Sequence, residues 1–390
     1  MAVAHGRAAT IFALPVRATK RGAERTPLER DCDVLICGAS FAGLAVAREL
    51  RASGARVMVV DRYEIGERQT SACAAPTEWL HNLGLDGSIR QTFGSLAVRT
   101  PRAAARWSLP FTFSTFDYRT LCGLLWDQAG GAEFETAKVN GRSGDVVRTD
   151  RGDLRAPLIV DALGWRRVLG PGANVQPPNA RLSRGLEVHP NGAGPDLELW
   201  IDPRYVPAGY GWSFPAGDEL RIGVGSFDPH RQVREPTARL ARDVAADPIR
   251  YQGNWIPHQL RPATEDGIFF VGDSAGHCLP LTAEGIRTAF YFGIACGRGL
   301  RAVLEGRRDR TDALRAYHAF SARHAWKYAA MLRAQDAIPH VHGRPLDTAV
   351  RAFARRRLSR WAFRHYLDIA PPAFALPAPP AAVRAPVEAR

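Results

Sequence analysis

The chain has 390 residues, of which 46% are hydrophobic and 23% are charged, a composition typical of a globular protein with room for two substructures. Its net charge is +13, but the basic residues are almost all arginine and are spread along the chain, so we do not expect nucleic acid as a partner. No apolar run approaches the roughly 20 residues that cross a bilayer, and the N-terminal apolar stretch lacks a convincing cleavage site. The sequence therefore predicts neither a membrane span nor a secretion signal.

The six cysteines show neither Cys-x-x-Cys pairs nor the dense framework of a small secreted domain, which favours a reducing, cytoplasmic location. No metal site is expected, because the C-terminal histidines lack a carboxylate or cysteine at a metal-ligand spacing. These histidines are His318, His324, His340 and His342.

The first periodic segment is a βαβ unit. Residues 33–37 read as a buried parallel strand, residues 44–53 as a helix with one apolar face, and residues 56–61 as the next strand. The turn between the first strand and the helix has the sequence Cys37-Gly-Ala-Ser-Phe-Ala-Gly43. A strand, a glycine-rich turn and a helix in this order are typical of nucleotide-binding folds.

The glycines of this turn have separate roles. Gly38 permits a tight exit from the strand, and Gly43 lets the helix pack closely on the sheet, whereas Ser40 stands where a dinucleotide-binding fingerprint prefers glycine. The N–H groups at the start of the helix, including those of Phe41 and Ala42, would bind a pyrophosphate. Asp61 ends the second strand at the expected spacing and would accept hydrogen bonds from an adenosine ribose with a free 2′-hydroxyl. An incidental glycine turn is the alternative, which the strand, helix and acid together disfavour.

From residue 182 to residue 228 the sequence changes to short alternating segments separated by turn residues, which predicts antiparallel sheet. Tyr210, Trp212 and Phe214 alternate along one of these segments, so their side chains should share one face. An aromatic face suits an apolar ligand such as an isoprenoid chain, and it equally suits an ordinary core.

A second glycine-rich turn begins at Gly272, directly after the strand-like residues 267–271, and opens into a helix. Asp273 could bind ribityl hydroxyls or cap a helix, and the following helix N-terminus could stabilise negative charge on a reduced flavin. Two such turns, far apart and in this order, indicate one long cofactor held at both ends. FAD is the cofactor that we expect.

The predicted fold class is α/β, with an FAD-binding Rossmann-like (doubly wound, three-layer) domain, an inserted antiparallel β-rich substrate domain and a C-terminal helical region. The expected boundaries are a disordered N-terminal segment 1–30, the FAD-binding domain in parts 31–105, 145–170 and 262–310, a helical connecting part 106–144, the substrate domain 171–261, C-terminal helices 311–368, and a disordered Pro/Ala tail 369–390.

The motif at residues 272–286 reads Gly-Asp-Ser-Ala-Gly-x-x-x-Pro-Leu-Thr-x-Glu-Gly-Ile. With the first turn and the Asp-Ala-x-Gly sequence at 161–164, it resembles FAD-dependent oxidoreductases of the geranylgeranyl reductase family, within the p-hydroxybenzoate hydroxylase-like superfamily. Residues 209–215 resemble that family's Tyr-x-Trp-x-Phe-Pro substrate-cavity motif. The likeness covers roughly residues 31–310.

The resemblance assigns each FAD contact to a residue of this chain. The pyrophosphate would contact Gly38, Ala39, Ser40 and Gly43, the adenosine end Asp61 and Arg62, the flavin side Arg119, the ribityl phosphate Gly272 and Asp273, and the isoalloxazine Pro280, Gly285 and Ile286. Ala283 stands where the family often has glycine.

The resemblance also points to reacting groups. Cys73 lies in the region where geranylgeranyl reductases carry a cysteine near the flavin, although its neighbours lack the usual glycine and acid, and inert burial is the commoner role of a free thiol. A thiol there could supply a proton while reduced flavin delivers a hydride from N5. His277 and Cys278 could touch the ring or pack, and Glu284 is an acid candidate or, in preference, a helix cap.

The function expected from these features is FAD-dependent redox chemistry on a hydrophobic, isoprenoid-like substrate. An aromatic monooxygenase using NAD(P)H and oxygen is the alternative. A flavin halogenase is disfavoured because Lys138, near a predicted strand and turn, is badly placed for the lysine that such enzymes need. A flavin- or lipid-binding protein without turnover is also disfavoured. Since no second dinucleotide fingerprint appears, NAD(P)H would bind transiently or be replaced by an electron-donor protein.

An apolar stripe with arginines beside it marks the C-terminal helical region. It could dock peripherally on anionic lipid, or it could cover its own domain, which is the commoner role of such a helix. The stripe consists of Leu346, Val350, Phe353, Ala354, Leu358 and Trp361.

Overall fold

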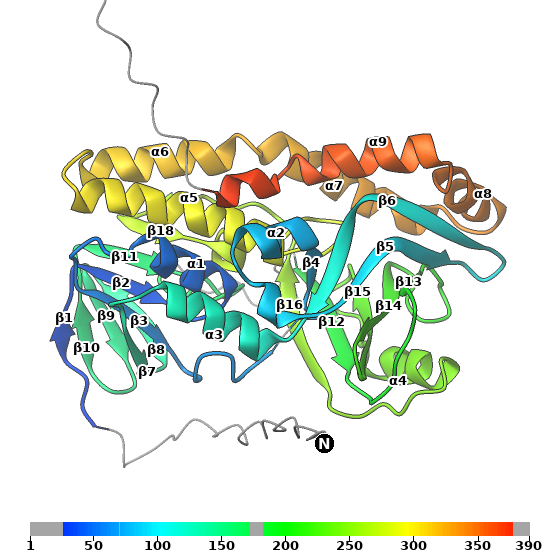
Figure 1. The fold of residues 1–390 in the computed structure, drawn as a ribbon, viewed down its shortest axis with the longest axis horizontal. Helices are drawn as coiled ribbons and strands as arrows, with labels where there is room; N and C mark the ends of the chain where they lie inside the picture. Colours follow the sequence, from blue (N-terminus) through cyan, green and yellow to red (C-terminus); the bar gives the residue numbers. More distant parts are fainter. Residues whose placement is uncertain (1–25, 70, 172–181, 377–390) are drawn as a thin grey trace, which may run out of the picture.

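The computed structural model describes residues 26–69, 71–171 and 182–376, and its two large sheets lie side by side beneath a row of helices (Figure 1). The first sheet has six strands, and neighbouring pairs are parallel except at β17 and β18. Its order is β17 (Thr264–Glu265), β18 (Ile268–Phe270), β11 (Leu158–Asp161), β2 (Val34–Cys37), β3 (Val57–Asp61) and β7 (Glu133–Thr136).

The register of this sheet brings distant turns together. Cys37 pairs with both Val60 and Asp161, and Asp161 pairs with Phe270. Because these strands are parallel, the segments that follow them leave at one edge. Both glycine-rich turns therefore begin at the carboxyl edge of the same sheet.

Two helices cover this sheet and pack on each other unusually closely. They are α1 (Phe41–Glu49) and α5 (Ile286–Leu304). A Cβ atom on Gly293 would lie 2.7 Å from the Ala42 carbonyl oxygen, and one on Gly297 would lie 2.6 Å from the Glu49 Cβ. The small residues of α5 thus let α1 sit tightly beside it. The helix predicted to run to residue 53 ends at Glu49, because the chain turns at Ala52 with φ of 58°.

A smaller sheet shares the hydrophobic core of the first one through Val139, Val147 and Leu154. Its order is β1 (Arg30–Asp31), β10 (Asp153–Arg155), β9 (Val146–Thr149) and β8 (Val139–Ser143).

The second large sheet has eight strands and bears α4 (Arg234–Asp243) on one face. Its order is β16 (Gln252–Pro257), β12 (Leu182–Val188), β15 (Glu219–Ser226), β14 (Gly209–Ala216), β13 (Leu197–Trp200), β5 (Ile89–Arg99), β6 (Ala104–Phe116) and β4 (Ala74–Pro76).

The sheet pairing differs from the domain boundaries expected at residues 105 and 106. β5 and β6 form one long hairpin within the eight-stranded sheet, and β5 pairs with β13 of the expected substrate domain. Helix α2 (Thr77–Asn82) precedes this hairpin, and only α3 (Tyr118–Gln128) makes the expected connecting part helical. Alternating aromatic residues in β6 are the signal of a strand there.

The remaining helices form the C-terminal region, and the fold class predicted from the sequence is confirmed. They are α6 (Arg310–Ala322), α7 (Ala325–Ala337), α8 (Arg344–Phe353) and α9 (Arg356–Leu367). The indole N–H of Trp107 in β6 donates to the Val350 carbonyl at 3.0 Å, and its ring lies 4.5 Å from that of Phe353. Helix α8 therefore covers the β5–β6 hairpin. None of the helices in the described part of the chain has both the length and the apolarity to pass through a bilayer.

The described residues at the two ends are ordered, contrary to the expectation of disorder up to residue 30 and from residue 369. Leu28 is buried, and its N–H donates to the Arg151 carbonyl at 2.8 Å. Ile369 and Ala370 are also buried, and the indole N–H of Trp79 donates to the Ala370 carbonyl at 3.0 Å. Composition predicted disorder here because these few buried apolar residues lie in segments that are otherwise rich in Arg, Thr, Pro and Ala. The rest of both expected tails, residues 1–25 and 377–390, lies outside the described residues.

Candidate cofactor-binding site

The first glycine turn is shaped by contacts that exclude a side chain. Gly38 has φ of 114°, and a Cβ on it would lie 2.3 Å from the Ala162 carbonyl oxygen. A Cβ on Gly43 would lie 1.9 Å from the Gly38 carbonyl oxygen. Real Cβ atoms do not approach backbone this closely. Both glycines are therefore required for α1 to start against the end of β2.

Ser40 fits the turn because its side chain is directed to another partner. It is the N-cap of α1 but makes no side-chain capping bond, and its Oγ accepts a hydrogen bond from the Tyr118 hydroxyl at 3.1 Å. The first N–H groups of α1 are thus left without the cap that a serine usually provides. Such N–H groups at the positive end of a helix are suited to bind phosphate.

Asp61 braces the first turn. Its carboxylate accepts hydrogen bonds from the Ala39 N–H at 2.8 Å and from the Tyr63 N–H at 3.0 Å. Burial raises the pKa of Asp61, although these bonds oppose the rise. The sequence predicted only a contact with ribose, because the fold of the turn onto its own strand end cannot be read from spacing.

The second turn touches the first. Gly272 has φ of 61°, and a Cβ on it would lie 2.9 Å from the Ala42 Cβ, at the start of α1. Asp273 follows in a short 3₁₀ turn (Gly272–Ala275), where burial raises its pKa to about 6 while the charge of Arg261 opposes the rise. The carboxylate therefore lies in a site of low polarity beside the end of β18.

Asp161, which the sequence did not single out as a site residue, joins the turns from behind. It is fully buried at the end of β11 and accepts hydrogen bonds from Ser274 Oγ at 2.6 Å and from the Leu163 and Leu169 N–H groups at 2.9 and 2.8 Å. Burial raises the pKa of Asp161 despite these bonds. Its position in the Asp-Ala-x-Gly sequence was the available signal.

The loop from Pro280 to Gly285 is strained and anchored. Leu281 and Ala283 have φ of 67° and 53°, in the left-handed region that favours glycine. The Leu281 N–H donates to Gln335 Oε1 at 2.7 Å, and the Tyr210 hydroxyl donates to the Thr282 carbonyl at 2.6 Å. The conformation at Ala283 explains why glycine is favoured at this place. Tyr210 ties the loop directly to the eight-stranded sheet.

Glu284 is an ion-pair partner rather than a helix cap. Its carboxylate pairs with the fully buried Arg287 at 2.8 and 2.9 Å and accepts a hydrogen bond from the Tyr366 hydroxyl, while Gly285 occupies the N-cap of α5. Arg287 also donates to the Ala370 carbonyl at 3.2 Å. This cluster connects the loop to residues 366–370. Arg287 and Tyr366 were not predicted from the sequence, because no local pattern indicates that Tyr366 contacts Glu284, 82 residues earlier in the chain.

Comparisons of the sequence and of the fold with known proteins identify similar flavoproteins. An FAD-binding domain model matches residues 31–100. Digeranylgeranylglycerophospholipid reductase 3 of Methanosphaera stadtmanae is 22% identical over 87% of this chain and 95% of its own length. Geranylgeranyl diphosphate reductase of Rhodobacter capsulatus is 28% identical over 38% of this chain and 39% of its own length. A geranylgeranyl bacteriochlorophyll reductase-like structure from Thermoplasma acidophilum superposes with a TM-score of 0.76 at 18% identity, covering 89% of this chain and 98% of that one.

The chain is an FAD-dependent oxidoreductase that is similar to geranylgeranyl reductases. The resemblance seen in the sequence is thereby confirmed, and FAD is the cofactor. The residues present fit it, because the glycines let the two turns approach each other closely and the first N–H groups of α1 lack a side-chain cap. An acid stands in each turn region, Asp61 at the end of β3 and Asp273 after β18.

The cysteine that resembles the one in geranylgeranyl reductases lies in the core. Cys73 is fully buried and precedes β4, with φ of 51°. Burial raises the pKa of its thiol well above the usual range, while the charge of Arg221 opposes the rise. The thiol is therefore protonated at neutral pH, which suits a proton donor and does not suit a nucleophile.

His277 and Cys278 pack inside the second turn. The His277 ring stacks on Phe292 with centroids 3.7 Å apart, and its Nε2 is hydrogen-bonded to Ser321 Oγ at 3.0 Å. Burial lowers the pKa of His277 well below its usual range, so the ring is neutral. Cys278 is buried, and its Sγ lies 3.4 Å from where a Cβ of Gly285 would stand.

The three predicted aromatic residues share one face of β14. The opposite face is covered by α4, since a Cβ on Gly211 would lie 2.7 Å from Leu240 Cδ2. The Trp212 ring lies over β15, where a Cβ on Gly223 would be 2.2 Å from Trp212 Cζ2. Glycine in β15 thus makes room for the indole. Tyr210 is 6.1 Å from Trp212 between ring centroids, and Phe214 follows on the same side.

Two arginines expected at the cofactor stand at the surface. Arg62 is exposed and stacks over Tyr63 at 4.8 Å. Arg119 is exposed at the start of α3, where its backbone packs against the turn at Gly66. Ile286 begins α5 and is buried. The contacts of these three residues with FAD stay predictions.

Proposed function

We propose that this protein reduces carbon–carbon double bonds of an isoprenoid lipid. The observation that carries the proposal is the contact between the two glycine turns at Gly272 and Ala42, joined by Tyr210 to the aromatic face of the eight-stranded sheet. The proteins from Methanosphaera stadtmanae and Rhodobacter capsulatus, named as reductases of geranylgeranyl compounds, support the substrate class. FAD, when reduced, supplies a hydride to one carbon of the double bond.

The two turns divide the FAD between them in this proposal. The N–H groups that follow Gly38 hold the pyrophosphate, and Asp61 accepts from the ribose. Asp273 accepts from the ribityl chain, because a carboxylate in a site of low polarity binds hydroxyl donors strongly. Gly285 opens α5 beside the ring, where the helix N-terminus favours the negative charge of the reduced flavin.

The second hydrogen is a proton, for which we propose Cys73 as the source. The Sγ–H bond breaks as a C–H bond forms on the substrate carbon, and the electron pair of the broken bond stays on sulfur. The thiolate then regains a proton from water that enters after the product leaves. Burial keeps the Cys73 thiol protonated before this step but also weakens it as an acid, so the charge of Arg221, which opposes the rise in pKa, favours the transfer.

The isoprenoid chain is proposed to lie along the aromatic face of β14, formed by Tyr210, Trp212 and Phe214. These side chains are only partly buried, whereas the alternating residues between them are covered by α4. Large apolar rings stabilise a hydrocarbon chain through the area that they remove from water.

The test is an anaerobic turnover in which dithionite reduces the flavin, so that the outcome does not depend on whether NAD(P)H or a donor protein serves in the cell. Incubation with geranylgeranyl phospholipid is expected to add two hydrogens per double bond, detected by mass spectrometry. A product that forms only with oxygen and carries a hydroxyl group would instead establish the monooxygenase alternative. No product under either condition would overturn the proposal.

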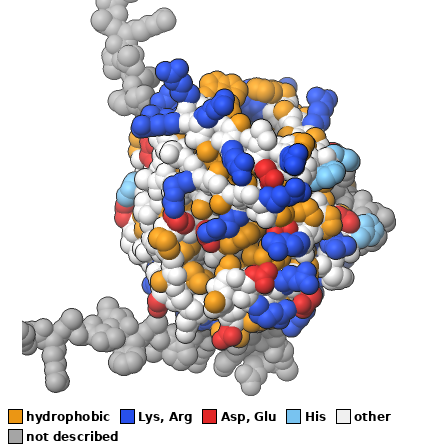
Figure 2. Space-filling model, turned by 90° about the vertical axis from the view of Figure 1, so that its right-hand side faces the viewer, with side chains coloured by type: hydrophobic (Ala, Val, Ile, Leu, Met, Phe, Trp, Pro, Cys, Tyr) orange, Lys and Arg blue, Asp and Glu red, His pale blue; other side chains and the backbone are white. Residues whose placement is uncertain are grey.

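A lipid substrate gives a reason for contact with the membrane surface, and α9 is the surface proposed for it. Leu358 and Trp361 are 42% and 61% exposed, so this half of the apolar stripe is not used to cover the domain. Residues 351–367 contain six arginines and no acidic residue. Figure 2 shows basic and hydrophobic side chains, with some acidic ones, intermingled on the end of the molecule that includes α8. Such a surface is complementary to anionic lipid.

Reversing the charge of this surface tests the contact. Arg356→Glu with Arg357→Glu should weaken co-sedimentation with vesicles of anionic phosphatidylglycerol by at least about fivefold for each residue, since each arginine near the surface contributes about 1 kcal/mol and the new carboxylate is repelled. Arg231→Glu, before α4, serves as the matched control. Equal binding by the α9 variant and wild type would rule out this surface.

A further inference from the structure

Cys73 is held in a backbone conformation that it does not favour. Its φ of 51° lies in the left-handed region, which residues with a side chain disfavour. Strain of this kind persists only where surrounding contacts determine the structure, and it concentrates at functional sites. The contacts that determine this turn are therefore informative about its role.

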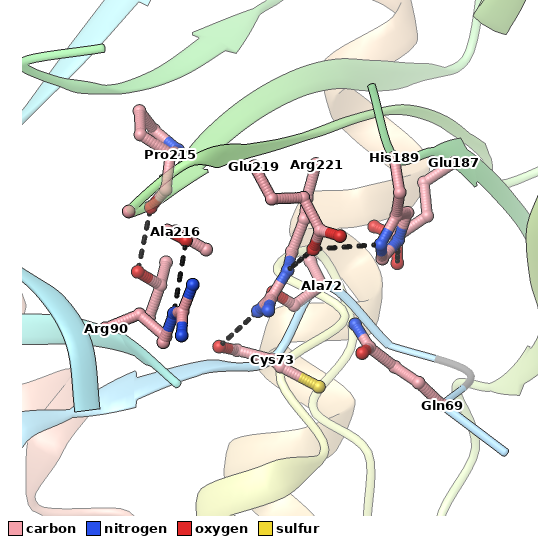
Figure 3. Close-up of polar contacts among 12 residues, drawn as sticks. Gln69, Ala72, Cys73, Arg90, Glu187, His189, Pro215, Ala216, Glu219 and Arg221 are labelled. Carbon is pink, nitrogen blue, oxygen red and sulfur yellow. Dashed lines mark hydrogen bonds and ion pairs between the residues drawn. The ribbon is translucent and has the colours of Figure 1, made fainter. Parts of the chain in front are cut away.

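A single side chain holds the turn from one side. Arg221 in β15 donates through Nη1 to the carbonyl oxygens of Ala72 at 2.9 Å, Cys73 at 3.2 Å and Phe116 at 2.9 Å. In Figure 3 the Cys73 sulfur lies on the opposite side of the residue from the carbonyl that Arg221 holds. Arg221 is only 3% exposed, so these bonds form away from water. Arg221 thus fixes the backbone of the turn and leaves the thiol free to face elsewhere.

Arg221 is in turn oriented by a row of charges, of which Glu187 and His189 are buried and Glu219 is partly buried (Figure 3). Its Nε donates to Glu219 Oε1 at 3.0 Å, and the same oxygen is 3.1 Å from His189 Nδ1. His189 Nε2 is 3.0 Å from Glu187 Oε1, and Glu187 also accepts a hydrogen bond from the Trp212 indole at 3.1 Å. Two cations and two carboxylates alternate in this row when His189 is protonated.

The row returns to the same turn at its other end. Gln252 of β16 donates to Glu187 Oε1 and lies 3.5 Å from the Ser71 carbonyl oxygen. The Cys73 N–H donates to Ser71 Oγ at 3.2 Å. Strands β12, β14, β15 and β16 therefore contribute to holding residues 71–73, and the row also includes Trp212 of the aromatic face.

We propose that Arg221 is a positioning residue, which sets the Cys73 turn and places a fixed positive charge near the thiolate that remains after proton donation. This inference rests on the proposed function, in which Cys73 supplies the proton. The charge of Arg221 is the largest opposing influence on the raised pKa of the thiol, which supports the second part of its role. A Lys at this place keeps the charge but cannot bond both Glu219 and the three carbonyls, since it lacks the planar fork.

The test is a double-mutant cycle between Arg221 and Cys73, with Arg90→Gln as the matched control. Arg90 donates to the Ala216 carbonyl of the same sheet but does not contact the turn. Arg221→Gln should lower kcat about tenfold or more in the wild-type background, with little change in KM or in FAD affinity. In the Cys73→Ala background the same change should lower kcat by less than about twofold, because the group through which Arg221 acts is absent. Arg221→Lys should restore part of the rate.

A second measurement reports on the turn without turnover. The S–H stretching band of Cys73, isolated as the difference between wild type and Cys73→Ala, should be narrow in wild type and broadened and shifted in Arg221→Gln. If the Arg221→Gln variant does not fold, the positioning role can still be tested with Arg221→Lys and Glu219→Gln, which are expected to change the same S–H band.

The outcomes separate this inference from the proposed function. Equal losses of kcat in both backgrounds, or an unchanged S–H band, would overturn the positioning role while anaerobic reduction by wild type still upheld the function. An unchanged kcat in Cys73→Ala would refute the proton donor and, with it, this role for Arg221. Failure of wild type to reduce any isoprenoid would refute the function, whatever the infrared band shows.

Discussion

At the scale of single residues, three carboxylates lie where turns leave the carboxyl edge of the six-stranded sheet: Asp61, Asp161 and Asp273. Asp61 and Asp161 accept hydrogen bonds from backbone N–H groups of the neighbouring turns, whereas Asp273 is stabilised chiefly by the charge of Arg261. A carboxylate with few protein partners in a buried place is available to a ligand. We therefore assign different roles to acids that look alike in the sequence.

Asp273→Asn tests this assignment. Loss of the charged acceptor should weaken FAD binding by about tenfold to a hundredfold, because hydrogen bonds to a charged group contribute about 1.5–3 kcal/mol. Asp127→Asn, at an exposed position of α3, should bind FAD like wild type. The measurement is the dissociation constant from quenching of FAD fluorescence. Unchanged affinity in Asp273→Asn would show that the acid does not contact the cofactor.

His189 gives a prediction for pH. Burial alone would lower its pKa, but hydrogen bonds and attraction from Glu187 and Glu219 raise it to about 9 from the usual 6.5. The folded state thus holds a proton that the unfolded state releases, so this stabilisation is complete below pH 6.5 and is lost as the pH rises through about 9. His189→Gln should therefore flatten the fall in free energy of unfolding between these pH values.

Urea unfolding at pH 6.5 and pH 9 measures that fall, and exposed His230→Gln is the control. A decline in His189→Gln as steep as in wild type would mean that the row of charges does not hold a protonated imidazole.

At the scale of elements, the position of the first turn depends on how closely α5 packs against α1. Gly293 and Gly299 lie in the same helix but have opposite surroundings: a Cβ on Gly293 would meet the Ala42 carbonyl oxygen at 2.7 Å, whereas a Cβ on Gly299 would meet nothing within 4 Å. The same substitution should consequently have opposite effects at the two places.

Gly293→Ala is expected to lower the free energy of unfolding by about 1–3 kcal/mol, since the backbone of α1 must shift. It should also weaken FAD binding, because Ala42 is in the first turn of α1. Gly299→Ala should raise stability by about 0.5–1 kcal/mol through helix propensity alone. Thermal and urea unfolding of the pair provide the measurement, and effects of the same sign would contradict the packing described.

The elements that sequence could predict are those whose signal is local. Buried strands β2 and β3 and the glycine turn between β2 and α1 follow from hydrophobic runs and glycine spacing, as does the second turn after β18. The pairing of β5 with β13 and the contact of Tyr366 with Glu284 could not be predicted, because they join residues far apart without a periodic pattern. For the same reason, the alternating sequence of β15 does not reveal that Arg221 is buried.

At the scale of the whole molecule, the FAD-binding part and the eight-stranded sheet are linked at two places. The Tyr210 hydroxyl holds the strained loop before α5, and Arg221 holds the Cys73 turn. Both residues come from the eight-stranded sheet, on β14 and β15. The loop beside the proposed flavin position and the turn of the proposed proton donor are thus both held by the eight-stranded sheet.

The proposed chemistry requires above all that the two glycine turns bind one FAD molecule together. The decisive measurement is an equilibrium titration of the protein with FAD, carried out in parallel for wild type, Gly43→Ala and Asp273→Asn. We predict one FAD per chain with a shifted visible spectrum for wild type, and weakened binding when either turn is changed. A wild-type protein that binds no FAD, or binding that neither variant affects, would contradict the account.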